Sequence, residues 1–260
     1  MEMKEEGRRI PAEDGAMIEV KSLNKSFGGL RAIQNLSVKV RSGETLGIIG
    51  PNGSGKTTLF NLINGFLKPD SGRIRYKGID ITGLTPPEVC LKGIGRTFQL
   101  VKPFPKMTVL ENVMVGAFAK HRSGSLSEVE RTAEEILATA GLLRFKNFLA
   151  ENMTLAHRKQ LELGRALATG SDVILLDEVM AGLNPKETGD MIRIVKAISG
   201  RGVTLLVIEH VMKAIMSLSD RIIVLHHGEK IAEGSPSEVI NDQKVIDAYL
   251  GKQISFALGK

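Results

Sequence analysis

One eight-residue segment constrains the fold of this chain more than any other. It reads Gly50-Pro51-Asn52-Gly53-Ser54-Gly55-Lys56-Thr57 and matches the pattern G-x-x-x-x-G-K-[ST] in full. The apolar stretch Thr45–Ile49 precedes it, and helical periodicity runs from Thr57 to Phe66. A glycine-rich turn between a strand and a helix lets backbone N–H groups converge on phosphate, and the helix dipole adds attraction. The segment therefore predicts a phosphate-binding loop.

The residues at the end of this loop suit a nucleoside triphosphate that carries Mg²⁺. Lys56 supplies a mobile cation for the terminal phosphates, and Thr57 supplies a hydroxyl for the metal ion. Thr58 follows directly in the helix. We expect residues 50–58 to bind nucleotide, with ATP and Mg²⁺ as the ligands.

A buried strand that ends in two carboxylates is the second strong signal. Val173–Leu176 is continuously apolar and leads into Asp177 and Glu178. Such runs are typical of strands buried on both faces of a parallel sheet, and ligands bind at the carboxyl ends of these strands. We expect Asp177 to hold the Mg²⁺ shell and Glu178 to accept a proton from the attacking water. An acidic pair alone is more often a solvated turn, but the phosphate loop favours the catalytic interpretation.

Strand and helix segments alternate along the chain, which predicts an α/β fold. Predicted strands cover Ile18–Leu23, Leu36–Val40, Thr45–Ile49, Gly72–Tyr76, Val173–Leu176, Val203–Ile208 and Ile222–Leu225; predicted helices cover Thr57–Phe66, Val109–Ala119, Val129–Ala140, Leu155–Thr169, Lys186–Ser199 and Val211–Ser217. Residues 83–152 lack such apolar strands, so we expect an inserted helical lobe there. Ser127 and Glu130 have the spacing of a capping box, which predicts that a helix of this lobe begins beside them.

Composition excludes several classes of protein. The chain has 260 residues, and its longest apolar runs fall far short of the roughly 18 to 20 residues that a membrane-spanning helix needs. Cys90 is the single cysteine and cannot form an internal disulfide, and the start does not resemble a signal peptide. We therefore expect a soluble protein that stays in the cytosol. The charged residues 1–16 are expected to be a mobile leader, and residues 252–260 a tail.

Further motifs follow in the order seen in ATP-binding cassette (ABC) ATPases. They read Gly95-Arg96-Thr97-Phe98-Gln99, Glu111-Asn112-Val113, Ala181-Gly182-Leu183-Asn184-Pro185, Val207-Ile208-Glu209-His210 and Asp247-Ala248-Tyr249-Leu250-Gly251. Over residues 17–251 the chain resembles this family, and it is most similar to the ATPase subunit of branched-chain amino acid importers. The resemblance implies one ATPase domain at 17–251: a P-loop NTPase core with a mainly parallel sheet, an N-terminal antiparallel β subdomain and a helical lobe at about 83–152.

The same resemblance assigns roles to three more side chains. Phe27 would stack on adenine, although a packed phenylalanine of an edge strand is an equally good interpretation. Gln99 would reach Mg²⁺ or the attacking water, the alternative being a solvated loop amide. His210 would contact the γ-phosphate and hold Glu178 and the water in line, and its spacing of one βα unit from Glu178 favours this over a plain surface histidine.

The chain departs from the family pattern at two places. The family signature, Leu-Ser-Gly-Gly-Gln, contacts ATP held by the opposite subunit; here the position reads Met153-Thr154-Leu155-Ala156-His157. Thr154 can replace the serine, but both glycines are lost, and glycine lets backbone approach a ligand closely. We expect the ATP site that receives Thr154, Leu155, Ala156 and His157 to hydrolyse slowly. Val179 replaces the family's proline, and the pair His226-His227 before Gly228 predicts a hairpin turn, not a metal site.

The net charge of +6 is distributed in two basic stretches. Residues 21–42 hold five basic and no acidic residues around the phosphate loop, and residues 91–122 hold six basic and one acidic residue around Gln99. Residues 123–151, in contrast, hold three basic and five acidic residues. Such a distribution, without interleaved aromatic residues, disfavours a nucleic-acid partner. By the resemblance, the stretch 91–122 would meet a membrane partner.

The function expected from these observations is ATP hydrolysis that powers a membrane transporter, with branched-chain amino acids as the cargo. The expected partners are membrane permease subunits, a second ABC ATPase subunit, identical or related, and indirectly an extracytoplasmic binding protein. This places the chain at the cytoplasmic face of the inner membrane as a peripheral protein. Three alternatives stay open: a related transporter for urea, aromatic acids or lipopolysaccharide, a soluble ABC ATPase acting on nucleic acid, and a nucleotide-binding regulator without turnover.

Overall fold

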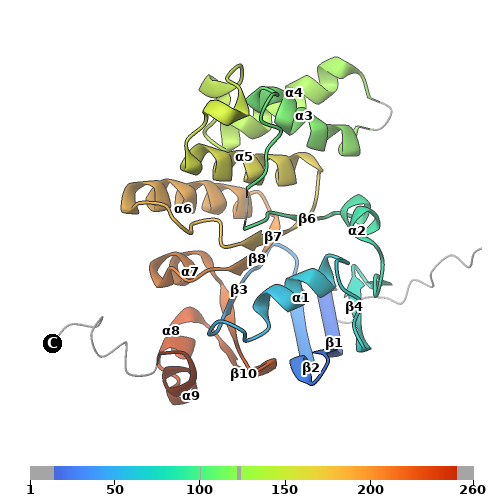
Figure 1. Cartoon of the computed structure of the whole chain (residues 1–260), viewed down its shortest axis with the longest axis vertical. Helices are drawn as coiled ribbons and strands as arrows, with labels where there is room; N and C mark the ends of the chain where they lie inside the picture. Colours follow the sequence, from blue (N-terminus) through green and yellow to red (C-terminus); the bar gives the residue numbers. More distant parts are fainter. Residues whose placement is uncertain (1–14, 100, 122–123, 251–260) are drawn as a thin grey trace, which may run out of the picture.

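Two β-sheets and a group of helices build the molecule, seen in Figure 1 as a computed structural model that describes residues 15–99, 101–121 and 124–250. The expected tail at 252–260, most of the leader, and Gly251 and Arg122 of the sequence patterns lie outside the described residues. Among those described, no helix has the length and apolar character needed to cross a membrane.

The smaller sheet is antiparallel and is formed by the N-terminal part of the chain. Its order is β2-β1-β4-β5, with β1 at Ala16–Phe27, β2 at Leu30–Arg41, β4 at Ser71–Tyr76 and β5 at Ile79–Asp80. The first two strands extend well beyond the segments Ile18–Leu23 and Leu36–Val40, because they continue as one hairpin to the turn at Gly28-Gly29. The expected antiparallel β subdomain is confirmed.

The larger sheet is mainly parallel, in the order β10-β9-β3-β8-β7-β6. Its strands are β3 (Thr45–Ile49), β6 (Ile94–Arg96), β7 (Val173–Asp177), β8 (Thr204–Ile208), β9 (Arg221–His226) and β10 (Glu229–Gly234). In the described part of the chain, neighbours pair in parallel except β9 and β10, which form an antiparallel hairpin. Every residue of β3, β7 and β8 is buried, which explains their continuous apolar runs.

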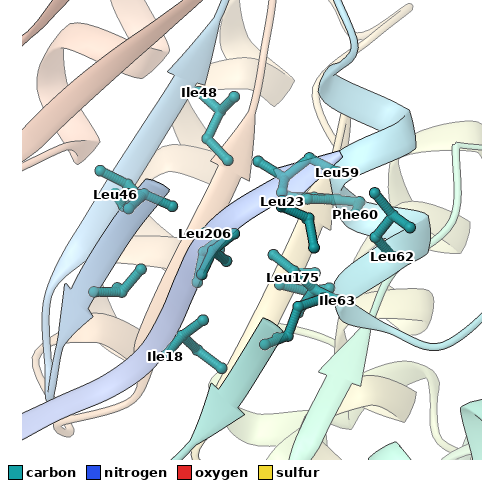
Figure 2. Close-up of a cluster of buried hydrophobic side chains, with 14 of the residues drawn as sticks. Ile18, Leu23, Leu46, Ile48, Leu59, Phe60, Leu62, Ile63, Leu175 and Leu206 are labelled. Atoms are coloured by element: carbon teal, nitrogen blue, oxygen red, sulfur yellow. The ribbon is translucent and has the colours of Figure 1, made fainter. Parts of the chain in front are cut away.

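Helices cover both faces of this sheet, and neighbouring strand residues point to opposite faces. Leu175 and Leu206 pack with α1 (Lys56–Ile63) between the two sheets, as Figure 2 shows. Leu176 and Leu205 pack on the other face with α6 (Pro185–Ser199) and α7 (Met212–Leu218). The last described elements are α8 (Pro236–Ile240), α9 (Gln243–Val245) and a π-helical turn, Ile246–Leu250.

A separate helical group stands at one end of the molecule (Figure 1). It consists of α3 (Val109–Lys120), α4 (Leu126–Thr139) and α5 (Leu155–Ala168), with 3₁₀ turns at Leu143–Phe145 and Ala150–Asn152. The three helices share a core of their own, to which each contributes fully buried residues, among them Val113, Leu137 and Leu161.

Two sequence predictions in this region were wrong in detail. Residues 83–152 were expected to lack strands of the main sheet, but β6 lies within them, after α2 (Pro86–Lys92), and pairs in parallel with β7. Three residues at a sheet edge are too few to show a pattern. The capping box uses Ser125 and Glu128 instead of Ser127 and Glu130, because both pairs have the required spacing and the earlier one adds two residues to the helix.

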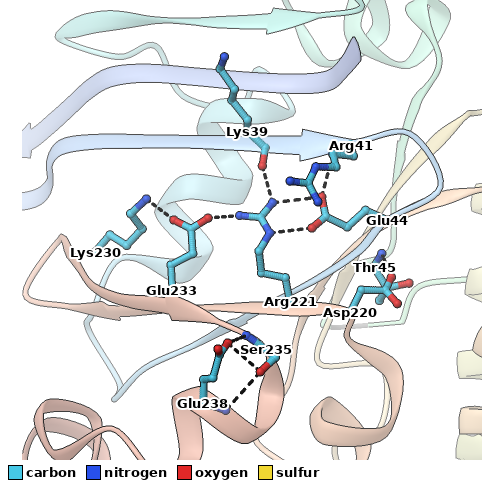
Figure 3. Close-up of polar contacts among 10 residues, drawn as sticks. All are labelled: Lys39, Arg41, Glu44, Thr45, Asp220, Arg221, Lys230, Glu233, Ser235 and Glu238. Carbon is cyan, nitrogen blue, oxygen red and sulfur yellow. Dashed lines mark hydrogen bonds and ion pairs between the residues drawn. The ribbon is translucent and has the colours of Figure 1, made fainter. Parts of the chain in front are cut away.

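A partly buried arginine, Arg221, joins the two sheets through polar contacts (Figure 3). Arg221, the first residue of β9, donates from Nε to Glu44 Oε1 at 2.7 Å and from Nη2 to the carbonyl of Lys39 in β2 at 2.6 Å. It also pairs with Glu233 of β10, which Lys230 contacts in turn. This network fixes the angle between the sheets at the edge opposite the carboxyl ends of the parallel strands.

Candidate nucleotide-binding and catalytic site

The phosphate loop, residues 50–57, begins where β3 ends, and two of its glycines are required by close contacts. Gly50 has φ +151°, and a Cβ there would lie 2.1 Å from the carbonyl oxygen of Leu225. Gly55 has φ +105°, and a Cβ there would lie 2.4 Å from the carbonyl oxygen of Ala32. Strand β9 and the first sheet therefore press against the loop, and no side chain fits at either position.

Lys56 is folded over this loop. Its Nζ donates to the carbonyl oxygens of Gly50 at 2.7 Å and Pro51 at 3.0 Å, and the residue is 6% exposed. Burial lowers the pKa of Lys56, while the nearby Glu178 and Asp177 act in the opposite direction. The hydroxyl of Ser54 is buried with no hydrogen-bond partner among the described residues. An unpartnered buried hydroxyl and a lysine at one glycine-rich turn fit a phosphate group.

Glu178, the residue after β7, has the left-handed backbone conformation that residues other than glycine rarely adopt, with φ +51°. Contacts from two other elements hold it there. Its N–H donates to the carbonyl of Ile208 at 2.9 Å, and its own carbonyl accepts from Lys159 Nζ of α5 at 2.9 Å. The backbone is therefore fixed by β8 on one side and by α5 on the other.

The carboxylate of Glu178 lies between the two other residues assigned to catalysis by the sequence. Gln99 Nε2 donates to Oε2 at 2.7 Å, and His210 Nε2 lies 3.0 Å from Oε1. Gln99 follows β6 and His210 follows β8, so the carboxyl ends of three parallel strands bring the trio together. Both partners are exposed, whereas Glu178 is half-buried.

Asp177 is buried at the end of β7 and is suited to a divalent cation. Burial raises the pKa of its carboxyl group, and the hydrogen bond from Arg96, at 2.9 Å, acts to lower it. A cavity of about 490 Å³ is lined by Thr57, Gln99 and Asp177 among others. Hydroxyl, amide and carboxylate oxygens are the ligands that Mg²⁺ takes in proteins. These residues therefore fit the metal ion that the phosphate loop implies.

Two charged residues of the site were missed by the sequence reasoning. Glu209 is 1% exposed, and its Oε1 accepts from the N–H of Met180 at 2.8 Å; burial raises the pKa of Glu209 to about 7. Lys159 is 4% exposed, and burial lowers its pKa. A carboxylate directly after a continuous apolar strand was the available signal for Glu209. Nothing local marks Lys159, which looks like one more polar residue of a helix.

The remaining predicted residues lie away from this trio. Thr154 caps α5, with its Oγ1 accepting from the N–H of His157 at 3.3 Å. Leu155 is half exposed, Ala156 is buried, and the His157 ring packs 4.5 Å from that of Phe145. These four residues thus form the N-terminal turn of the helix that carries Lys159, with Thr154 and Leu155 exposed.

Phe27 ends β1 and is 47% exposed, with Lys25 Nζ 5.5 Å from its ring centroid. The alternative of a packed phenylalanine is thereby excluded. The hairpin turn at His227-Gly228 is confirmed: both residues have positive φ, and the backbone carbonyls of this turn accept from Gln34. Among the described residues, no group of three or more His, Cys, Asp and Glu side chains is placed to hold a metal ion.

Comparison with known proteins gives consistent matches. The protein-family model described as ABC transporter matches residues 33–181. A second family model, described as branched-chain amino acid ATP-binding cassette transporter, matches residues 229–254. Two relatives are high-affinity branched-chain amino acid transport ATP-binding proteins. BraF of Pseudomonas aeruginosa is 39% identical to this chain and LivG of Salmonella typhimurium is 38% identical, each over 91% of this chain and 98% of the relative.

A crystal structure of a nucleotide-free ATP-binding cassette from an ABC transporter superposes with a TM-score of 0.82 and 34% identity. The match covers 91% of this chain and all of that one. Because the first of the two models spans more than half of the chain and the relatives align over nine tenths of it, the chain belongs to the ABC transporter family of ATP-binding cassettes.

Proposed function

We propose that this chain hydrolyses ATP and thereby powers the uptake of branched-chain amino acids through separate membrane permease subunits. The observation that carries the proposal is the Glu178 carboxylate, held between Gln99 and His210 at the sheet edge where the phosphate loop begins. A general base must lie within hydrogen-bond reach of a water and must be fixed in direction. The two hydrogen bonds and the anchored backbone of Glu178 meet the second condition, because they fix the direction of the carboxylate.

The reaction follows from these positions. Lys56 and the loop amides would bind the phosphates, and Glu178 lies near enough to Lys56 to raise its pKa, so a terminal phosphate held by Lys56 would lie near Glu178. A water held by Gln99 and Glu178 attacks that phosphorus while the bond to the β-phosphate oxygen breaks, and its proton passes to Glu178. His210 orients the carboxylate and contacts the phosphoryl oxygens. Mg²⁺, when bound by Thr57, Gln99 and Asp177, supplies neutralising charge to the phosphate oxygens.

A second ATPase subunit, identical or related, would complete the site. The N-terminal turn of α5 exposes Thr154 and Leu155 to solvent at the end of a 14-residue helix, and helix N-termini attract phosphate. The turn makes no hydrogen bond to Gln99, Glu178 or His210 in the described part of the chain. It is therefore available to a nucleotide on a partner subunit, as a two-subunit sandwich requires.

A groove between the sheet domain and the helical group supports docking of a permease. Its volume is about 380 Å³, and residues from α2, β6, α3 and α5 line it. Three large apolar side chains that line it are exposed: Phe66, Phe98 and Val115. We refer to it as the docking groove. Exposed apolar residues gathered at a groove favour an apolar partner segment, and this would hold the chain against the inner face of the membrane.

The cargo is the finer part of the proposal. It is supported by the C-terminal match to a branched-chain amino acid transporter model and by the described activity of the relatives. The choice among amino acids would belong to the extracytoplasmic binding protein. A binding screen on that protein, with leucine, isoleucine and valine against urea and aromatic acids, tests the cargo.

Glu178→Gln tests the enzymatic part. The variant keeps a hydrogen-bonding group between Gln99 and His210 but removes the base, so ATP hydrolysis should fall by roughly 10²-fold or more. ATP should still bind and should hold two subunits together on size-exclusion chromatography. Glu229→Gln, an exposed change on β10, is the matched control and should leave the rate unchanged. Retained hydrolysis in Glu178→Gln would contradict the assignment.

A further inference from the structure

Arg96 makes an ion pair with the residue assigned to the metal ion. It ends β6, and its Nη2 donates to Asp177 Oδ2 at 2.9 Å, with both side chains about 95% buried. Among the described residues, the Asp177 carboxylate accepts a hydrogen bond only at Oδ2, from Arg96. The charge that Asp177 would offer to a divalent cation is therefore already matched by an internal cation.

The guanidinium has a second set of partners that do not involve Asp177. Nη1 donates to Asn61 Oδ1 of α1 at 2.6 Å. The Cζ atom lies 5.3 to 5.9 Å from the ring centroids of Phe60, Phe66 and Phe98, which is within the range of cation–π attraction. Arg96 can therefore stay buried and favourably placed without its contact to Asp177.

Arg96 also lies in the wall between two cavities. It lines the cavity that contains Thr57 and Asp177, and it lines the docking groove. The rings of Phe66 and Phe98 pack edge to face, with 5.8 Å between their centroids. Each side chain is about half exposed at that groove. A shift of the guanidinium would therefore change its contacts with rings that are exposed at the docking groove.

We infer that Arg96 is a positioning residue that competes with the divalent cation for Asp177: it neutralises the carboxylate before the cation arrives, and afterwards it rests on Asn61 and the three phenylalanine rings. This rests on the proposed function in one respect, namely that a divalent cation accompanies ATP at Asp177. The competition sets the metal affinity of the site and links metal binding to the docking groove.

The test measures Mn²⁺ binding to the full chain with a non-hydrolysable ATP analogue, by the paramagnetic resonance signal of free Mn²⁺. Arg96→Met should lower the Mn²⁺ Kd by at least about fivefold, because a buried positive charge beside the ligand is lost. Arg96→Lys should stay near the original value. Asn61→Ala removes the resting place of the guanidinium, so it should raise the Kd. This opposite sign keeps the test informative if Arg96→Met folds poorly.

Arg165→Met is the matched control, since Arg165 lines the same cavity, pairs with Glu162 at 3.0 Å and contacts the ring of Phe104. Its Mn²⁺ Kd should not change. An unchanged or raised Kd in Arg96→Met, or a lowered Kd in Asn61→Ala, would overturn the competition. Binding of the analogue with saturating Mg²⁺ is measured in parallel: its absence in every variant would overturn the proposed ATP binding instead.

The link to the groove has its own readout. The chain has no tryptophan, so Phe66→Trp places a single reporter beside Arg96. Its emission should shift when Mn²⁺ is added to the analogue-bound protein, and the shift should be lost when Arg96→Met is added. A shift of equal size without Arg96 would overturn the link.

Discussion

The backbone conformation of Glu178 is held by residues that lie outside its own sequence motif. Its left-handed backbone costs roughly 1 to 3 kcal/mol for a residue with a side chain, so other contacts must hold it. Ile208 accepts from the N–H of Glu178 and Lys159 donates to its carbonyl, and Glu209 holds the next turn by accepting from the N–H of Met180. The direction of the Glu178 carboxylate thus depends on two buried side chains, Lys159 and Glu209, that do not contact the carboxylate oxygens.

Glu209 gives a prediction for the pH dependence of stability. Its pKa is raised from 4.5 to about 7 in the folded chain, so the folded state keeps a proton that the unfolded state has released between these values. The free energy of unfolding should therefore fall as the pH rises through this window. The full effect corresponds to about 3 kcal/mol. Glu209→Gln carries no such proton and can still accept from Met180.

Urea unfolding of both proteins at pH 5 and pH 8 measures this. Glu209→Gln should gain stability relative to the original chain as the pH rises. Glu229→Gln, on the exposed face of β10, should follow the original chain at both values. Parallel curves for Glu209→Gln would show that the buried carboxyl group does not take up a proton in this range.

At the scale of elements, the first turn of α5 is where the departure from the family signature can be tested. Ala156 is 9% exposed there, and a glycine in its place would let the backbone approach a ligand more closely. Ala156→Gly should raise the ATPase rate of the assembled transporter, although a glycine in a helix costs about 1 kcal/mol of stability.

The stability cost needs a control of its own. Ala138→Gly makes the same change at an exposed position of α4, so it should carry the helix cost and leave the rate unaltered. An unchanged rate in Ala156→Gly would remove the idea that the lost glycines slow the partner's site.

An element could be predicted from the sequence when its own residues determine it, and not when it depends on contacts with residues far away in the chain. Strands β3, β7 and β8 are buried on both faces, so their apolar runs are visible in the sequence, and the carboxyl ends of these strands place Asp177, Glu178 and His210 together. Strand β6 is three residues long and is fixed by its pairing with β7. The contact of Arg96 with Asp177 is a consequence of that pairing, so no local pattern contains it.

At the scale of the whole molecule, the arrangement of parts produces the docking groove. Residues from α2 and β6 form one side, and residues from α3 and α5 form the other. The helical group has its own core, and α5 also contributes Leu163 and Ala166 to the core of the larger sheet. Helix α5 also contacts the sheet domain, because Lys159 donates to the carbonyl of Glu178. A partner bound in the groove would therefore contact both α5 and β6, which flank the catalytic site.

Charge reversal beside this groove tests the assembly. Lys102 is exposed at the cavity that also contains Thr57 and Asp177, and Lys106 pairs with Glu151 at 3.1 Å with most of its side chain exposed. An exposed pair of this kind contributes about 0 to 1 kcal/mol, so the double change to glutamate should leave the fold intact. It should reduce co-purification with the permease subunits, because an anionic patch at the anionic inner leaflet is repelled.

The same four-unit change in charge elsewhere separates a local effect from an effect of net charge. Lys196 on α6 and Lys213 on α7 are exposed and do not line the groove, so Lys196→Glu with Lys213→Glu should co-purify normally. The Lys196 and Lys213 variant should bind ATP like the original chain. The Lys102 and Lys106 variant should still bind ATP, because Lys56 and the loop are untouched. Loss of ATP binding in the Lys102 and Lys106 variant would assign these lysines to the nucleotide instead of the membrane partner.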